Sequence, residues 1–513
     1  MAVNAIELSV FANRIAALCE EMGATLGCAA LSPNIRDRLD YSCALFDAGG
    51  ALLGQATHIP VHLGSMAYAM ADLVRDRRWQ EDDVLIVNDP FLGGTHLPDV
   101  TMIAPVFHEG ELIGFVANRA HHADIGADTP GSMPLSTCLE EEGVIIPPSL
   151  LFERGVRNES IWSSLLGQLR QPRTSAADFD AQVAACRTGA QRTKNLIREL
   201  GNEKFVRLSA QLQQYAARLS RISLSEIPDG TYSFEDVMDS DGQGNRDIRL
   251  HVQISVRGGT VDIDFEGTSD QVAGNINCPM PVTAAAVTYV FRCLLPEQIP
   301  ACAGALEDLQ ISAPEGCLVN ARRPAAVTAG NVETSMRIVD VICGALSEAL
   351  PEKIPAAGQG TMNNIAMGAE GEDGWDYYET LGGGSGGGAE FSGVNGRQVH
   401  MTNTLNTPVE VLERSFPLRI LQYCLREGSA GDGLQAGGNG QLREYELLGP
   451  TRVSLLTERR SNVPWGLQGG LPGMAGSNSL DGEELAAKCS FEAAEGQRLL
   501  IKTPGGGGWG TVR

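Results

Sequence analysis

Residues 88–122, NDPFLGGTHLPDVTMIAPVFHEGELIGFVANRAHH, contain two apolar runs that flank a short polar loop. The runs VTMIAPVF and LIGFVANR are rich in β-forming residues, and the loop between them is His108-Glu109-Gly110-Glu111. This pattern predicts an antiparallel β-hairpin. With the turn centred near Gly110, residues whose numbers sum to about 220 face each other, so Asp99 should lie opposite His121.

The hairpin lies in the part of the chain that is richest in histidine. Six of the eight histidines fall between positions 58 and 122, with several aspartates among or near them. They are His58, His62, His96, His108, His121 and His122, and the aspartates include Asp40, Asp89, Asp99 and Asp124. Neutral imidazole nitrogen and carboxylate oxygen bind divalent ions well at neutral pH. We therefore expect a metal site at the open end of the hairpin, with His96 arriving from the loop before it.

A second hairpin repeats this arrangement. The runs YSCALFD (41–47) and ALLGQAT (51–57) flank Ala48-Gly49-Gly50, and folding about that turn would place Asp40 near His58. Each hairpin then carries an acidic and an imidazole residue at its open end, where the rim of a sheet meets a cavity. We expect these two ends to converge, and we expect His108, at the far end of the first hairpin, to be an ordinary surface histidine.

The composition limits the class of partner and the compartment. A formal charge of −24 repels nucleic acid and anionic membranes, so we expect neither as a partner. The sequence has no run of 18 apolar residues and no signal-peptide pattern at its start, which favours a cytoplasmic protein. Its twelve cysteines form no C-x-x-C pair, so neither a thiolate zinc cluster nor a thioredoxin-like couple is indicated.

The length of 513 residues exceeds what one core usually holds, and we expect an α+β, multi-domain fold. The N-terminal residues Phe11, Ile15, Leu18 and Met22 have helical spacing. Later in the chain, Asn331 is predicted to cap a helix over 336–350. Four regions are expected: a metal-bearing, hairpin-rich α+β region (1–140), a helical insertion (141–222), an α/β region (223–370) and a Gly-rich, mainly β region (371–513).

Two glycine clusters occupy the last region, GGGSGGG (382–388) and TPGGGGWG (503–510). Neither has the lysine and hydroxyl of a phosphate-binding P-loop, and neither opens a βαβ unit. We expect tight turns or a mobile substrate loop there. No G-x-x-x-x-G-K-[ST] motif occurs in the sequence, so nucleotide-driven chemistry would need another subunit.

Nine motifs, in order along nearly the whole chain, resemble those of the hydantoinase B/oxoprolinase family. They are RDRLDYSCALFD (36–47), HIPVHLGSM (58–66), NDPFLGGTHLPDVT (88–101), NRAHHADIG (118–126), TPGSMP (129–134), GNVETS (330–335), QGTMNN (359–364), HMTNTLNTPVEVLE (400–413) and TPGGGGWG (503–510). Two departures are visible: Ala127 stands where glycine is common, and Glu140-Glu141-Glu142 is unusually acidic. We expect both to affect substrate access rather than the metal.

The resemblance implies a subunit of an ATP-dependent cyclic amidohydrolase that opens hydantoin, 5-oxoproline or lactam rings. A hydantoinase A-like partner would bind ATP and phosphorylate the small cyclic amide, and this chain would hydrolyse the activated species within a hetero-oligomer. The resemblance further implies that Asp40, His96, Asp99 and His121 hold one divalent ion. A site of nitrogen and oxygen ligands without thiolate tolerates Zn, Mn or Fe, so the identity of the ion stays open. We add His122, Asp124 and His58 as candidate catalytic residues.

Two other functions remain open. Related chains serve in ATP-dependent acetone and acetophenone carboxylases, so the chain could belong to a ketone carboxylase. A non-catalytic scaffold for the ATPase partner is the third possibility, and the intact set of metal ligands argues against it.

Overall fold

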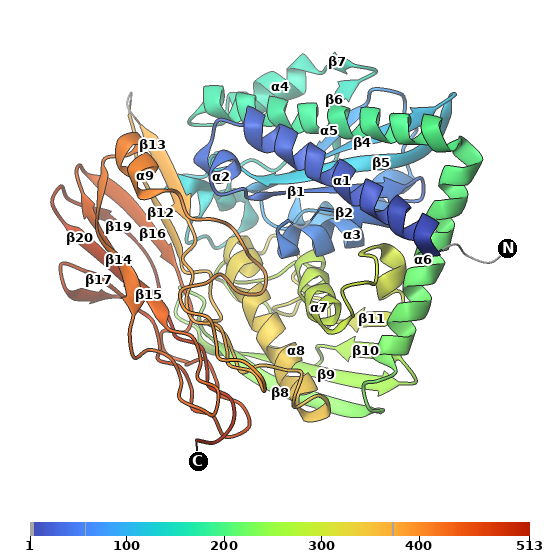
Figure 1. The fold of residues 1–513 in the computed structure, drawn as a ribbon. Helices are drawn as coiled ribbons and strands as arrows, with labels where there is room; N and C mark the ends of the chain where they lie inside the picture. Colours follow the sequence, from blue (N-terminus) through green and yellow to red (C-terminus); the bar gives the residue numbers. More distant parts are fainter. Residues whose placement is uncertain (1–4, 57, 372–373, 513) are drawn as a thin grey trace.

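The computed structural model describes residues 5–56, 58–371 and 374–512, which form four β-sheets with helices packed between and around them (Figure 1). The architecture is mixed α and β with several sheets, as expected from the sequence. None of the helices in the described ranges is long and apolar enough to cross a membrane.

The first sheet has seven strands in the order β2-β1-β5-β4-β3-β6-β7. They are β1 (Tyr41–Asp47), β2 (Leu52–Gln55), β3 (Val84–Val87), β4 (Asp99–His108), β5 (Glu111–His121), β6 (Ser149–Glu153) and β7 (Val156–Arg157). The predicted hairpin of β4 and β5 is confirmed, and its register pairs Asp99 with His121. On the other side of β5, strand β1 pairs Tyr41 with Ala120, which brings Asp40 beside His121.

Helices cover both faces of this sheet (Figure 1). On one face lie α1 (Ala5–Ala29) and α5 (Pro172–Leu200), and on the other lies α3 (Pro60–Arg75). The apolar residues that predicted a helix at the N-terminus are buried in α1, so that prediction is confirmed. The other α-helices of the described residues are α2 (Pro33–Arg36), α4 (Glu159–Leu166), α6 (Asn202–Leu224), α7 (Met280–Leu294), α8 (Ser335–Ala349) and α9 (Val409–Ser415).

A second sheet, in the order β11-β10-β9-β8, is formed by the central part of the chain. Helix α7 packs against α3, and α8 packs against both α7 and β8, so that helices fill the space between the two sheets. The strands are β8 (Gly230–Ser240), β9 (Arg246–Arg257), β10 (Thr260–Asp264) and β11 (Leu309–Ser312). One large apolar core joins these layers.

The C-terminal strands form two further sheets, drawn in orange and red in Figure 1. Their orders are β13-β12-β16-β19 and β14-β15-β20-β17-β18. The apolar side chains of Ile365, Leu447, Leu455 and Ile501 belong to one buried cluster shared by the two sheets. The strands are β12 (Asn364–Ala369), β13 (Trp375–Glu379), β14 (Leu418–Arg426), β15 (Gly440–Leu447), β16 (Thr451–Leu456), β17 (Ser477–Leu480), β18 (Glu483–Leu485), β19 (Lys488–Ala493) and β20 (Arg498–Lys502).

Sheet pairing crosses two of the predicted divisions. Strand β6 falls in the range predicted as a helical insertion, yet it pairs with β3 in the first sheet. Strand β12 begins at Asn364, before the expected start of the Gly-rich region at 371, and pairs with β16. Pairing between strands that are distant in sequence leaves no local sequence pattern, because the backbone N–H and C=O groups of one strand bond to a partner strand elsewhere in the chain.

The two glycine clusters are buried and packed against each other. Gly387 donates its N–H to Gly507 O at 2.9 Å, and Gly384 donates to Pro504 O at 3.0 Å. A Cβ on Gly386 would lie 1.7 Å from Ala356 O, which no side chain tolerates. The glycines therefore permit close backbone packing, whereas the sequence had suggested turns or a mobile loop.

Candidate metal centre

Three imidazoles converge on one carboxylate oxygen at the open end of the β4–β5 hairpin. Oδ1 of Asp99 lies 3.2 Å from His62 Nε2, 3.2 Å from His96 Nε2 and 3.3 Å from His121 Nδ1. All four side chains are buried. The ligand atoms of His96, Asp99 and His121 lie within 4.8 Å of one another, a spacing that one metal ion can bridge.

The other oxygen of Asp99 is held by hydrogen bonds, which leaves Oδ1 to the imidazoles. Thr95 donates its hydroxyl to Asp99 Oδ2 at 2.7 Å, and Asn331 donates its side-chain amide to the same oxygen at 3.4 Å. Asn331 lies in a π-helical turn, Gly330–Thr334, that precedes α8. The prediction that Asn331 caps this helix is wrong, because its side chain is directed to Asp99 instead.

The charges in the cluster suit a divalent cation. Burial alone would raise the pKa of the Asp99 carboxyl, but His62, His96 and His121 favour its anion and hold the pKa well below the ordinary value. Burial lowers the pKa of His121, which favours neutral imidazole. An ionised carboxylate beside neutral imidazole is the protonation state in which these groups bind a metal.

Unpaired polar atoms supply a direct test of whether the residues fit a metal. Asp99 Oδ1 and His96 Nε2 are buried, and neither has a hydrogen-bond partner among the residues that the structure describes. The other ring nitrogen of His96, Nδ1, lies 3.3 Å from the carbonyl oxygen of Thr328, which can only accept, so we place a proton on Nδ1. The Nε2 lone pair then faces a carboxylate oxygen, and two acceptors at that distance need a proton or a cation between them.

The second predicted hairpin does not continue to His58. Strand β2 ends at Gln55 and α3 begins at Pro60, so the register that would place His58 opposite Asp40 is lost. His58 instead accepts the N–H of Cys43 at 3.1 Å, and its Nε2 lies 3.7 Å from a carboxylate oxygen of Glu20. These contacts direct it toward α1 and away from the cluster.

His62 occupies the position expected for His58. Its Nε2 lies 3.9 Å from Asp40 Oδ1 and 3.2 Å from Asp99 Oδ1, so it bridges the two aspartates. Asp40 also accepts the backbone N–H of His121 at its carbonyl oxygen. The sequence holds a signal for this role, because His62 falls in the first turn of α3, which begins with a proline two residues before it.

The two remaining catalytic candidates lie beside the cluster. His122 contacts Gln182 Oε1 through Nε2 at 2.9 Å and stacks on Phe179 of α5, with its Nδ1 buried and unpaired. Asp124 accepts the N–H groups of Gly126 and Gln171, which ties two loops together. Both side chains are thus joined to α5 or to the residue that precedes it.

Sequence reasoning missed Tyr378 and Arg38, which border the cluster. The Tyr378 ring stacks on His121 with centroids 4.8 Å apart, and its hydroxyl donates to Asn364 Oδ1 at 2.7 Å. The guanidinium of Arg38 lies over the same ring and 3.8 Å from Asp40 Oδ2. Tyr378 comes from β13, more than 250 residues beyond His121, so no local pattern could have linked them.

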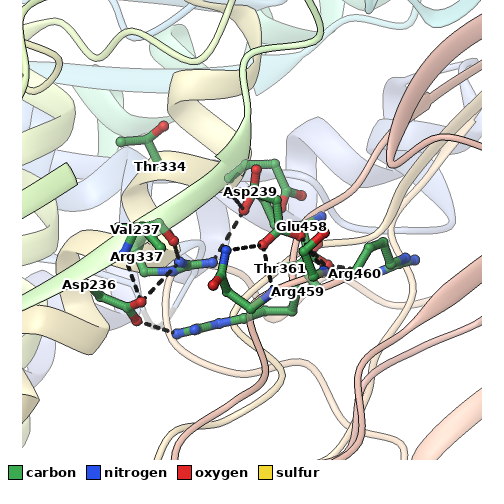
Figure 2. A network of polar contacts seen from close by, with 12 residues as sticks. Asp236, Val237, Asp239, Thr334, Arg337, Thr361, Glu458, Arg459 and Arg460 are labelled. Atoms are coloured by element: carbon green, nitrogen blue, oxygen red, sulfur yellow. Dashed lines mark hydrogen bonds and ion pairs between the residues drawn. The ribbon is translucent and has the colours of Figure 1, made fainter. Parts of the chain in front are cut away.

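A buried charge network joins the C-terminal sheets to α8 and β8 (Figure 2). Arg337 lies 3.2 Å from Glu458 Oε2, and Arg459 lies 2.8 Å from Asp236 Oδ2. Within the network, the side chains of Arg337, Arg459 and Lys488 form ion pairs with Asp236, Asp340 and Glu458, and Asp239 accepts the backbone N–H of Arg460.

Glu333 is an additional buried acid at the edge of this network. Its Oε1 accepts the Asn364 amide at 2.6 Å and the Met362 N–H at 3.0 Å, which links it through Asn364 to Tyr378. Burial raises the pKa of Glu333 from 4.5 to about 8.

This pKa predicts a pH-dependent loss of stability. Because the folded state holds the proton of Glu333 more tightly than the unfolded chain does, the free energy of unfolding should fall as pH rises from 5 to 8. Glu333→Gln removes this titration, so the wild type should lose about 3 to 4 kcal/mol more than the variant over that range. Urea unfolding at several pH values measures the difference, and Glu348→Gln, at an exposed site on α8, is the control. Parallel pH profiles for wild type and Glu333→Gln would contradict the assignment.

Comparison with known sequences places the chain in a protein family. The sequence model described as hydantoinase B/oxoprolinase matches residues 4–512. An uncharacterized protein of Methanocaldococcus jannaschii is 38% identical, over 99% of this chain and 91% of that protein. A protein of a Pseudomonas species, described as a putative D-/L-hydantoinase subunit, is 31% identical, over 99% and 90%. The 5-oxoprolinase 1 of Arabidopsis thaliana is 39% identical over 99% of this chain, which spans only 42% of that longer protein.

Two solved structures share the fold. The ATP-dependent caprolactamase from Pseudomonas jessenii superposes with a TM-score of 0.92 at 27% identity, covering all of this chain and 92% of that one. A nucleotide-free acetone carboxylase superposes with a TM-score of 0.89 at 18% identity, covering 99% and 76%. At that identity the second likeness concerns the fold alone.

Proposed function

This chain belongs to the hydantoinase B/oxoprolinase family, and from that premise we propose that it is the metal-dependent subunit of an ATP-dependent cyclic amidohydrolase. Its substrate would be a small cyclic amide such as a hydantoin, 5-oxoproline or a lactam. A hydantoinase A-like partner would bind ATP and phosphorylate the amide oxygen. The names of the hydantoinase subunit and of the caprolactamase support a cyclic amide and a partner subunit.

One observation carries the proposal: the unpaired Oδ1 of buried Asp99 is surrounded by His62, His96 and His121. A set of nitrogen and oxygen donors without thiolate suits Zn, Mn or Fe. We propose His96, Asp99 and His121 as ligands, with Asp40 as the fourth and His62 as a neighbour that connects both aspartates. A scaffold without chemistry would have no need to bury such a set.

The chemistry follows from what an amide requires. A lactam carbonyl is a weak electrophile, and phosphorylation of its oxygen makes the carbonyl carbon electrophilic enough for water to attack. When bound, a divalent ion would polarise the substrate oxygen and lower the pKa of a water molecule. Asp99 and the imidazoles of His62, His96 and His121 face one point, and Thr95 and Asn331 keep Asp99 in that orientation. The cyclic amide, ATP and two water molecules would give the ring-opened product, ADP and phosphate.

His122, Asp124 and His58 remain candidates for proton transfer. Of these, His122 has the stronger support, because its Nδ1 is buried and unpaired one residue after His121. Asp124 and His58 have contacts that suffice to explain them as loop supports. Alanine variants of all three, assayed in the assembled complex, rank these candidates.

The second candidate function is a subunit of an ATP-dependent ketone carboxylase, because chains with the same family motifs also serve in such carboxylases; acetone carboxylase shares the fold. Co-expression with a hydantoinase A-like partner separates the two functions. The purified complex would receive ATP with cyclic amides, or ATP with ketones and labelled bicarbonate. We expect ring-opened product from an amide, whereas labelled carbon in a ketone-derived acid without amide hydrolysis would overturn the first choice.

A further inference from the structure

The acidic run Glu140-Glu141-Glu142 contains one residue that differs from its neighbours. Glu140 and Glu141 are exposed, whereas Glu142 is fully buried. Its Oε1 accepts three hydrogen bonds: from the Ser136 hydroxyl at 2.7 Å, from Val327 N at 2.8 Å and from Thr328 N at 2.9 Å. A side chain without solvent exposure cannot gate substrate from solvent, so the expected role in substrate access does not fit Glu142.

The backbone that Glu142 holds is the one that contacts His96. The N–H of Thr328 donates to the Glu142 carboxylate, and the carbonyl oxygen of Thr328 lies 3.3 Å from His96 Nδ1. The next amide, Ala329 N–H, donates to Asn275 O at 2.9 Å. Because that N–H and the Thr328 carbonyl belong to one planar peptide unit and point in opposite directions, the bond to Asn275 aims the carbonyl at His96.

A second hydrogen bond fixes the segment 324–328, which contains Val327 and Thr328. Leu139 N donates to Pro324 O at 2.9 Å, so the 3-10 turn that carries Glu142, Leu139–Glu142, meets the segment at two points. The segment is thus held on both sides of the peptide that faces His96. An imidazole whose Nδ1–H is bonded to a fixed carbonyl has one tautomer and one ring orientation.

We infer that Glu142 is a positioning residue for the metal centre: through the backbone of Val327 and Thr328 it fixes the tautomer and the orientation of His96. Its effect on metal affinity rests on the proposed metal centre, but its effect on the tautomer does not. Ordering the ring in advance leaves Nε2 directed at Asp99 Oδ1, 3.2 Å away. Loosening the segment should therefore weaken metal binding without removing any ligand.

The variants test this inference with Zn²⁺ alone as the probe. Glu142→Gln keeps an oxygen that can accept the same three bonds, and the position of its amide matches Oε2, which has no partner. Glu142→Leu keeps the volume and removes the acceptor, and Glu140→Gln is the exposed control. Competition with a chromophoric chelator gives the Kd. We expect a Kd about 10- to 100-fold weaker for Glu142→Leu, and Glu142→Gln and Glu140→Gln within about threefold of the wild type. A Glu142→Leu variant that folds and binds Zn²⁺ like the wild type would overturn the inference.

A measurement on the wild type decides the case if Glu142→Leu fails to fold. Nitrogen NMR of ¹⁵N-histidine-labelled, metal-free protein reports which ring nitrogen of His96 carries the proton, with His96→Ala to assign the signal. We expect a proton on Nδ1 at a pH where the ring is neutral, and a neutral ring protonated only at Nε2 would overturn the inference. Since neither readout uses ATP or an amide, a failure of the proposed amidohydrolase activity would be seen separately.

Discussion

Asp99→Asn is expected to remove the metal and abolish ring opening. The variant keeps the shape of the side chain but removes the anion that faces three imidazoles at once. Loss of outer-shell partners costs roughly 10- to 100-fold in metal affinity, so loss of this direct ligand should cost at least about 100-fold. Metal content measured by elemental analysis after gel filtration should fall from about one ion per chain to near zero.

A matched variant separates this effect from damage to the fold. Asp178 is also a buried aspartate, but it accepts the backbone N–H groups of Leu31 and Ser32 outside the cluster. Asp178→Asn should lower the stability and keep the metal. Full metal content in a folded Asp99→Asn protein would remove Asp99 from the ligand set.

Gly386→Ala should be among the most destabilising substitutions in the C-terminal half. A Cβ at this position would lie 1.7 Å from Ala356 O, a backbone atom held by the neighbouring glycine segments, so relief requires a backbone shift. Overpacking of this kind costs about 3 kcal/mol or more. Gly449→Ala is the matched control, because nothing lies within 4 Å of its Cβ position and its φ is not positive. Chemical unfolding should separate the two variants, and equal stabilities would contradict the packed arrangement of the glycine clusters.

The local part of the site could be predicted from the sequence. The position of Gly110 fixes the β4–β5 register, and the register pairs Asp99 with His121. Counting from the turn did not find the partner of Asp40. Strand β1 also pairs with β5, and the chain leaves the sheet after Gln55. Strand β2 ends at Gln55, earlier than its sequence indicates, and His62 therefore lies where His58 was expected.

The distant parts of the site could not be predicted in this way. Thr328, Asn331 and Tyr378 reach the cluster from segments more than 200 residues away in sequence. Their contacts depend on how the layers stack, which hydrophobic patterns do not specify. The family motif GNVETS contains Asn331, but the motif alone does not say that its amide faces Asp99.

The central claim is that the partner activates the amide and this chain completes its hydrolysis. The most direct test measures phosphate release and ring-opened product in one complex carrying His121→Ala, with His108→Ala at the far end of β4 as the control. Activation precedes water addition, so we expect the His121→Ala complex to retain substrate-dependent ATP turnover while forming no ring-opened product. A His121→Ala complex that opens the ring at the wild-type ratio of product to phosphate would contradict the claim.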